Sequence, residues 1–467
     1  MKIQNADKQN QISSVGITHD TLTSRGGMAF ILHYLDRIGI WILFSKTIGH
    51  LRFSSKGKPI ETIVRQLIAA FIDGNDISMQ GFDRRRKSPE LSSLLECAQE
   101  DVVGGSIVRR FFFKFIGARY RLLRPILHHL FVWRLKIEKP KVVHLYIDTM
   151  VLDNDQGLKR EGCKPTYKKV KGFQPLQVHW QNFIVDMEFR SGEKHSNHSN
   201  GVSKSITNLV SLIRDKYDPN VPIVVNCDSG FLSDANFNHF EELGIHYIGM
   251  GKLYDYLYEQ LKDIDMNALP TVEGSNAAWA YYEFGSRFQN KAYIKFRRTI
   301  FTTIVRENEQ TILRGIRPDT FMYTNIGTNV ILDQKLIDAG LANLLKTEEI
   351  IRMAHNNGAE ELNHRSIKEF MGTEHLPFKL FGMNGAYYFI MVIAHFLAEA
   401  YRQDVAVDSL PQRCYPTTLR RTVIDFAAKI IKTGGRIILK VTKTVWDHIN
   451  VEKLWERCNN PQVIPSA

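Results

Sequence analysis

Two apolar runs that each end in an aspartate constrain the fold of this chain more than any other feature. The run at 142–147 ends at Asp148, and the run at 221–227 ends at Asp228. Each run has the length and the β-branched content of a buried strand. A third acidic residue, Glu361, lies in a stretch with helical periodicity. Two strand-end aspartates and a helix glutamate are able to converge on a pair of divalent cations, so we expect a metal centre here.

The order of elements around these acids predicts an α/β fold. Beyond Pro140 the pattern predicts strands at 142–148, 176–180 and 183–189, then a helix with apolar residues at 3.6-residue spacing, then a strand at 221–227. A helix at about 234–243 and a strand at 245–248 follow. Three strands and then alternating helix and strand is the element order of a ribonuclease-H-like catalytic core. That fold places carboxylates on its first and fourth strands and on a late helix.

The chain is longer than a single hydrophobic core usually supports, so we expect several domains. Residues 25–137 have helical patterns, 252–330 are rich in β-branched and aromatic residues, and the last segment is strongly basic. The predicted division is a helical N-terminal DNA-binding domain (1–137), the first part of the ribonuclease-H-like core (138–251), a β-rich insertion (252–335), the second part of the core with the catalytic helix (336–405) and a basic C-terminal region (406–467).

Composition limits the partners and the compartment. The formal net charge of +12 and the pI near 9.3 favour a polyanionic partner, although charge alone fits RNA or a membrane surface equally well. Five dispersed cysteines predict reduced thiols, not disulfides or a zinc site. The apolar stretch 386–398 is too short to span a bilayer, which predicts a buried helix and no membrane partner. We therefore expect a cytoplasmic protein. The sequence contains no phosphate-binding loop of the G-x(4)-G-K-[ST] kind, so it does not indicate ATP dependence.

Each carboxylate also has a plainer interpretation. Asp148 could cap a turn and have no other role, and Asp153 and Asp155 compete with it for the ligand role. Asp228 precedes Ser-Gly and could cap a helix. Glu361 could belong to a solvated helix face. The conjunction of the three acids at the required element ends favours the metal centre.

Lys368 adds a constraint to this set. It follows Glu361 at the spacing E-x(6)-K, which is two helical turns, so both side chains point the same way. The glutamate would then bind metal while the lysine holds a DNA phosphate as a point charge.

With these motifs the chain resembles bacterial insertion-sequence transposases of the DD-E type, in the cut-and-paste branch whose third motif reads Y-x(2)-R-x(3)-E-x(6)-K. The resemblance covers nearly the whole chain. The segments that carry it are Thr23-Ser24-Arg25-Gly26-Gly27, Asp73-Gly74-Asn75-Asp76-Ile77, the Asp148 block with Gln156-Gly157, Pro175-Leu176, Arg190-Ser191-Gly192-Glu193-Lys194-His195-Ser196, Cys227-Asp228-Ser229-Gly230-Phe231, Asn357-Gly358-Ala359-Glu360-Glu361 and Ile367-Lys368-Glu369. The chain departs from the third motif at its tyrosine and arginine positions, where it has Ala354 and Asn357.

The resemblance implies a function and its partners. It implies a transposase that cuts and joins the terminal inverted repeats of its own insertion sequence with Mg²⁺, or Mn²⁺ as a substitute. The metal ligands would be Asp148, Asp228 and Glu361, with Lys368 as a further catalytic residue. Double-stranded DNA, as inverted repeats and as target, would be the partner of a homodimer on paired ends, in the nucleoid of a bacterial cytoplasm.

Several residues are predicted to contact DNA. Arg109 and Arg110 lie in an arginine-rich helical segment that suits DNA docking, although a packing domain with a solvated charged face is an alternative. In the insertion, Trp279 is followed by Arg297 and Arg298, and aromatic residues mixed with basic ones can stack an unpaired base. A buried tryptophan in a small β core is the alternative. The remaining predicted DNA contacts are Lys368, His195 and Asn357.

Two other functions compete with transposition. One is a metal-dependent DNA nuclease without strand transfer, which the departures at Ala354 and Asn357 keep open. The other is a decayed transposase that retains only DNA binding, against which the presence of all three acids argues.

Overall fold

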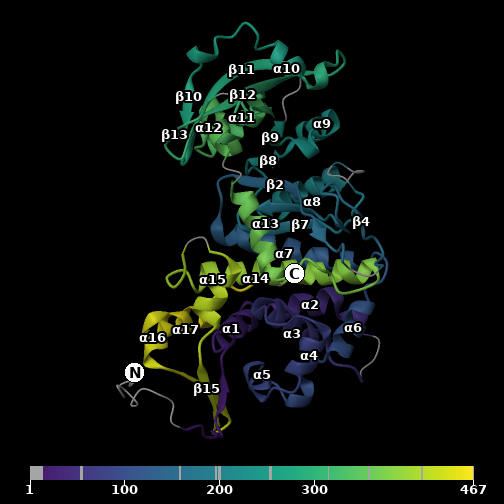
Figure 1. Ribbon diagram of the computed structural model, residues 1–467, viewed down its shortest axis with the longest axis vertical. Helices are drawn as coiled ribbons and strands as arrows, with labels where there is room; N and C mark the ends of the chain where they lie inside the picture. Colours follow the sequence, from purple (N-terminus) through teal and green to yellow (C-terminus); the bar gives the residue numbers. More distant parts are fainter. Residues whose placement is uncertain are drawn as a thin grey trace, which may run out of the picture.

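The computed structural model describes residues 14–465 apart from 53–55, 157–158, 195–196, 198–200, 252–254, 314, 356–357 and 412–413, and for 358–363 it describes the backbone only. The described part is elongated, with a β-rich lobe at one end, a helical body at the other, and a long sheet that begins between them (Figure 1).

One ten-stranded mixed sheet runs through the upper part of the molecule. Its spatial order is β10-β11-β12-β14-β9-β8-β2-β6-β7, and β13 pairs with β12 outside this path. The strands are β2 (Val143–Thr149), β6 (Leu176–Trp180), β7 (Phe183–Glu188), β8 (Ile223–Cys227), β9 (His246–Gly251), β10 (Thr271–Glu273), β11 (Ala277–Arg287), β12 (Phe296–Glu307), β13 (Gln310–Thr311) and β14 (Thr320–Thr324).

The half of the sheet around β2 has the predicted strands. β2, β6 and β7 form an antiparallel meander, and β8 and β9 then add parallel to β2 on its other side. The parallel strands need crossover connections, which are the helices α8 (Gly201–Lys216) and α9 (Asp234–Glu242). The strands and helices predicted between 142 and 248 are thus confirmed, with shifts of a few residues at their ends.

The other half of the sheet holds the strands predicted for the insertion. β14 pairs antiparallel with β9, so these strands extend the central sheet instead of building a separate β core. The longest strands of the predicted insertion are β11 and β12, and β12 is one continuous strand that begins at Phe296. Before it lies a turn in which Gln289 and Asn290 have positive φ. β14 was not foreseen, nor was a small sheet with the order β3-β5-β4, formed by β3 (Leu152–Asp153), β4 (Lys164–Pro165) and β5 (Lys171–Phe173).

Helices fill the N-terminal third, as the sequence predicts. They are α1 (Met28–Ile38), α2 (Ile40–Ile48), α3 (Ile60–Asp73), α4 (Met79–Arg85), α5 (Pro89–Leu94), α6 (Gly105–Phe113) and α7 (Arg124–Glu138). The helix α3 ends at Asp73, and Gly74 caps it in the left-handed conformation with φ 70°.

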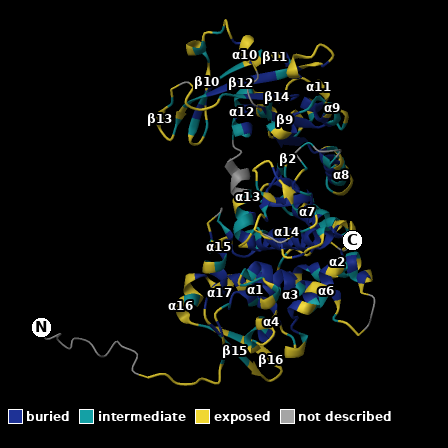
Figure 2. Cartoon of the chain, turned by 45° about the vertical axis from the view of Figure 1, so that its right-hand side comes forward, coloured by how far each residue is buried: buried dark blue, intermediate teal, exposed yellow. Residues whose placement is uncertain are grey.

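The apolar stretch 386–398 lies within α14 (Phe381–Asp404), between the sheet and the N-terminal helices (Figure 1). On the sheet side Phe396 packs on Phe183 of β7, and on the helical side Tyr387 packs on Phe71 of α3. Among the described residues, α14 is long and apolar enough to cross a membrane, and so is the bent pair α1–α2 if it is taken as one span. However, 94% of the most apolar window of α14 is buried inside the protein. This confirms the predicted buried helix, which is dark blue along its length in Figure 2.

After the strands of the sheet come α11 (Val330–Asp338), α12 (Thr347–His355) and α13 (Gly358–Met371), which precede α14. The basic segment after 406 is folded as α15 (Pro416–Leu419), a π-helical turn (Arg420–Ile424), β15 (Ala428–Thr433), β16 (Arg436–Val441), α16 (Lys443–His448) and α17 (Val451–Asn459). It packs on the N-terminal helices, because β15 pairs with β1 (Thr21–Thr23) and Trp455 stacks on His33 of α1. The first and last parts of the described chain therefore form one structure.

The contact between α1 and the π-helical turn gives a stability prediction. A Cβ added at Gly27 would lie 1.7 Å from the backbone oxygen of Val423, whereas one added at Gly16 meets nothing within 4 Å. We expect Gly27→Ala to lower the free energy of unfolding by about 2 kcal/mol or more, since backbone atoms must move. Gly16→Ala should change it by less than about 0.5 kcal/mol. Urea unfolding of both variants measures this, and equal stabilities would contradict the close packing.

Candidate active site

Parallel pairing of β2 with β8 brings two of the predicted carboxylates together. Ile147 lies opposite Cys227 in the register, so Asp148 and Asp228 are the next residues on neighbouring strands at the same edge of the sheet. Asp148 is still part of β2, and Asp228 follows β8. Asp228 caps the short helix after β8, because its Oδ1 accepts a hydrogen bond of 2.9 Å from the Gly230 amide. The capping interpretation is thus correct, and it fixes the carboxylate at this edge.

The helix α13 lies against Asp148. Nδ1 of His364 is 3.3 Å from Oδ2 of Asp148, while the amide of Thr149 donates to Oδ1 over 2.5 Å. Glu361 is three residues before His364 on α13, and residues three apart share a helix face. The backbone therefore directs position 361 toward the same edge, although its side chain lies outside the described part.

Lys368 is on the same helix face, one turn beyond His364. Its Nζ is 2.8 Å from Oε1 of Glu374, whose Oε2 accepts the amide of Asp153 over 3.2 Å. Lys368, which is predicted to contact a DNA phosphate, thus forms an intramolecular ion pair in this structure. The end of α13 is fixed as well, because Arg420 donates to the carbonyl of Phe370 over 2.9 Å.

A tyrosine that the sequence did not single out lies within the electrostatic influence of both aspartates. Tyr167 lies at the tip of a tight turn closed by the Thr166 amide on the Val170 carbonyl, and its side chain is 60% exposed. Partial burial, and then the charges of Asp148 and Asp228, raise the pKa of its phenol. Both carboxylates therefore act on the same phenol, in agreement with their neighbouring positions in the strand register. No periodicity or motif could have found it, because the turn is placed by tertiary structure.

Buried imidazoles lie behind the aspartates. The ring of His364 meets the ring of His179 edge to face at 5.5 Å, and His179 on β6 is within 3.2 Å of the Gln177 side chain. Burial, and then the neighbours His364 and His395, lower the pKa of His179 well below its usual range. Burial likewise lowers the pKa of His395 to about 4. These two rings are neutral at pH 7 and serve as packing and hydrogen-bonding groups.

The paired carboxylates fit a divalent cation. They are neighbours at one edge of the sheet, and hard carboxylate oxygens are the ligands that Mg²⁺ and Mn²⁺ prefer. Among the side chains that the structure describes, no group of three His, Cys, Asp or Glu residues is arranged for a metal ion, and Glu361 is not among those side chains. The competing aspartates form a turn, since Asp153 accepts the amide of Asp155 over 2.8 Å.

Trp279 lies at the same edge of the sheet. It is near the start of β11. Because β12 runs in the same direction as β8 and β9, and β11 runs antiparallel to β12, β11 begins at the edge where β8 and β9 end. Its ring is stacked on His355 of α12 with centroids 4.4 Å apart and planes 6° apart. His355 also lies 3.0 Å from the Thr302 hydroxyl, and burial lowers its pKa to about 4. One face of the tryptophan is therefore already covered.

Arg297 and Arg298 are separated from the aspartates across the sheet. They lie near the start of β12, and β14 and β9 stand between this strand and β8. Along the strand direction Arg298 is level with Ile248 and Asn226, two residues before the aspartates. Arg297 has 5% exposure and contacts Asp234 at 2.7 Å and Glu241 at 3.2 Å. Arg298 pairs with Glu283 and donates to the Ile326 carbonyl. The structure brings neither arginine to the carboxylates, because the insertion strands extend the sheet.

The other predicted DNA contacts are far from this edge or are not described. Arg109 and Arg110 are exposed on α6, in the helical body. His195 and Asn357 lie outside the described residues. Ala354, at the position of the motif tyrosine, is fully buried in α12.

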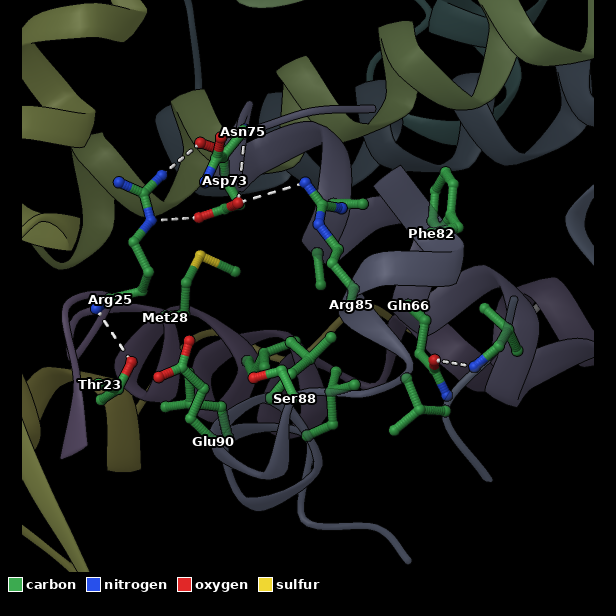
Figure 3. A pocket seen from close by; sticks show the side chains of 18 residues that line it. Thr23, Arg25, Met28, Gln66, Asp73, Asn75, Phe82, Arg85, Ser88 and Glu90 are labelled. Atoms are coloured by element: carbon green, nitrogen blue, oxygen red, sulfur yellow. Dashed lines mark hydrogen bonds and ion pairs between the residues drawn. The ribbon is translucent and has the colours of Figure 1, made fainter. Parts of the chain in front are cut away.

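The segments around Arg25 and Asp73, which carried part of the family resemblance, meet far from the carboxylates. Arg25 pairs with Asp73 at the end of α3 and with Asp425, and Arg85 lies 3.4 Å from Asp73 (Figure 3). These groups border a cavity of about 120 Å³ between α1, α3 and α5. These two segments thus hold the helical body together and do not contribute to the aspartate edge.

Of three comparisons with known proteins, the one with family models identifies the family of this chain. The family model described as "Transposase DDE domain group 1" matches residues 6–460. No curated protein matches. Among solved structures, a piggyBac transposase synaptic complex with hairpin DNA matches with a TM-score of 0.39 and 12% identity, over 87% of this chain and 82% of that chain. At this TM-score the structural similarity carries no further conclusion.

The buried position of Arg297 gives a second prediction. Arg297→Gln should leave the Asp234 and Glu241 carboxylates without their buried partner and lower the free energy of unfolding by about 3 kcal/mol. Arg306→Gln, which breaks an exposed pair with Glu273, should cost about 1 kcal/mol or less. Chemical denaturation gives both values. A DNA-binding defect in Arg297→Gln without any loss of stability would contradict the structural role.

Proposed function

Because the chain belongs to the DDE transposase family, we propose that it cuts the terminal inverted repeats of its own insertion sequence and joins them to target DNA. The family match over residues 6–460 supports transposition. The observation that carries the site assignment is the pairing of Asp148 and Asp228 at one sheet edge, with α13 against it.

We assign a ribonuclease-H-like core to β2, β6, β7, β8 and β9. Three antiparallel strands followed by two strands parallel to the first support this assignment, with helices α8 and α9 as the crossovers. The two aspartates then lie on the first and fourth strands of the core. The third acid, Glu361, lies on the late helix α13.

Asp148, Asp228 and Glu361 would hold two Mg²⁺ ions, or Mn²⁺ in their place. When bound, such ions activate a nucleophilic oxygen and stabilise the leaving oxygen of a phosphodiester. The protein's own side chains position the DNA. Lys368 would exchange its partner Glu374 for a phosphate oxygen, which is possible because both groups are about one third exposed. Tyr167 is exposed, and its phenol would be able to donate to a phosphate oxygen of a DNA strand bound near the aspartates.

Double-stranded DNA is the proposed partner, with a homodimer on paired ends. The net charge of +12 supports a polyanionic ligand. Exposed basic residues on the helical body, including Arg109 and Arg110, would contact the duplex away from the cleavage site. A cytoplasmic, nucleoid-associated protein of bacterial origin follows from this proposal.

A metal-dependent nuclease without strand transfer is the second candidate. It is favoured by one observation: Ala354, at the position where the resembling transposases have a tyrosine, is fully buried and offers no group to DNA. Pre-cut DNA ends distinguish the candidates, because a nuclease alone gives no joined product.

Substitution of a strand-end aspartate tests the proposed site. We expect Asp228→Asn to reduce Mg²⁺-dependent cleavage of a labelled duplex carrying the element's end by at least about 100-fold, since a charge-stabilising group is lost. End binding in a gel-shift assay should stay unchanged. Asp155→Asn, in the neighbouring turn, is the matched control and should cleave normally.

Substitution of the helix glutamate tests the third ligand, whose side chain the structure does not describe. We expect Glu361→Gln to abolish cleavage in Mg²⁺ while DNA binding persists. Cleavage equal to that of the wild type would mean that Glu361 is not a ligand. End binding without cleavage by the wild type itself would favour a decayed transposase.

A further inference from the structure

His364 is the contact between the catalytic helix and the first catalytic strand. Its Nδ1 lies 3.3 Å from Oδ2 of Asp148, and both side chains are about one fifth exposed. We propose that His364 is a positioning residue that donates its Nδ1–H to Asp148 and so holds this carboxylate in the orientation that binds a divalent cation. This inference rests on the proposed function, because it takes Asp148 to be a ligand.

The imidazole is held in place from behind. Its ring meets the ring of His179 edge to face, at 5.5 Å and 66°. His179 is itself fixed on β6 by the side chain of Gln177, which donates to the Tyr388 hydroxyl of α14 over 2.5 Å. His364 is therefore supported by two rigid elements, the sheet and the buried helix, as positioning of a ligand requires.

The hydrogen bonds at Asp148 leave its metal-binding role intact. The Thr149 amide donates to Oδ1, and His364 lies next to Oδ2. A carboxylate oxygen has two acceptor sites, so a hydrogen bond to it is compatible with a cation on the other side. Carboxylate ligands of metals are commonly oriented by such donors, and loss of the donor typically lowers metal affinity 10- to 100-fold.

The same contact sets the distance between two ligand-bearing elements. Position 361 is one turn before His364 on α13, so the contact of His364 with Asp148 fixes how near this turn lies to β2. The rest of the helix is anchored independently: Ser366 bonds His395 of α14 at 3.0 Å, and Arg420 bonds the Phe370 carbonyl. Loss of the Nδ1 donor should therefore disturb the metal site without detaching the helix.

Two substitutions separate hydrogen bonding from packing. His364→Asn keeps an N–H donor at the position of Nδ1 and removes the ring. His364→Phe keeps the ring against His179 and removes the donor. The measurement is a calorimetric titration of the DNA-free full-length chain with Mn²⁺, and thermal unfolding is recorded for each variant to show that it folds.

We expect His364→Phe to bind Mn²⁺ at least about 10-fold more weakly than the wild type and His364→Asn to bind it within about 3-fold. Cleavage of the element's end by the Phe variant should recover as the Mn²⁺ concentration is raised. The opposite order, in which Asn is weak and Phe normal, would show that the ring only packs and would overturn the proposal.

Asp148→Asn distinguishes failure of this inference from failure of the proposed function. If Asp148→Asn weakens Mn²⁺ binding but His364→Phe does not, the metal site stands and the positioning role is wrong. If neither substitution changes Mn²⁺ binding, Asp148 is not a ligand and both proposals fall together.

Discussion

The parallel pairing of β2 with β8 is the interaction on which the rest of the site depends. Parallel strands share the direction of their carboxyl ends, so residues that follow a register pair emerge side by side. The pair Ile147–Cys227 therefore determines that Asp148 and Asp228 meet. A slip of one residue between these strands would turn one aspartate to the other face of the sheet. The alternating burial along β2 and the full burial of β8 oppose such a slip.

Burial of α14 makes this edge rigid. The helix packs on β6 and β7 through Tyr388 and Phe396 and on α3 through Tyr387, so it joins the sheet to the helical body. Asn384 shows how a polar group is tolerated there: it is fully buried, and its amide donates to and accepts from the backbone of Phe378. The helix thereby holds the loop that leads into it, next to the end of α13.

The sequence predicted which segments of the core form strands and helices better than it predicted which residues contact one another in the folded chain. Strand and helix periodicity located β2, β6, β7, β8 and β9 because each is long, apolar and bounded by turn residues. It placed Asp148 and Asp228 at strand ends correctly for the same reason. It failed for Arg297, whose charge suggested DNA but whose partners lie elsewhere in the chain. His364 was missed because its contact with Asp148 is a tertiary one. Tyr167 was missed because tertiary structure places its turn within the electrostatic influence of the aspartates.

The pairing of β1 with β15 has a consequence for biosynthesis. Leu22 pairs with Lys429, and Arg25 binds Asp425, so the first strand finds its neighbours only after some 400 further residues exist. At about 5–20 residues per second, a ribosome needs on the order of 20–80 s for that length. Until then, the surface of the nascent helical body that contacts β15 and α17 stays exposed. Arg420, which holds the end of α13, also arrives late. A ribosome-bound chain therefore has Asp148 and Asp228 in place before α13 is anchored next to them, and this arrangement is completed only after Arg420 has been synthesised.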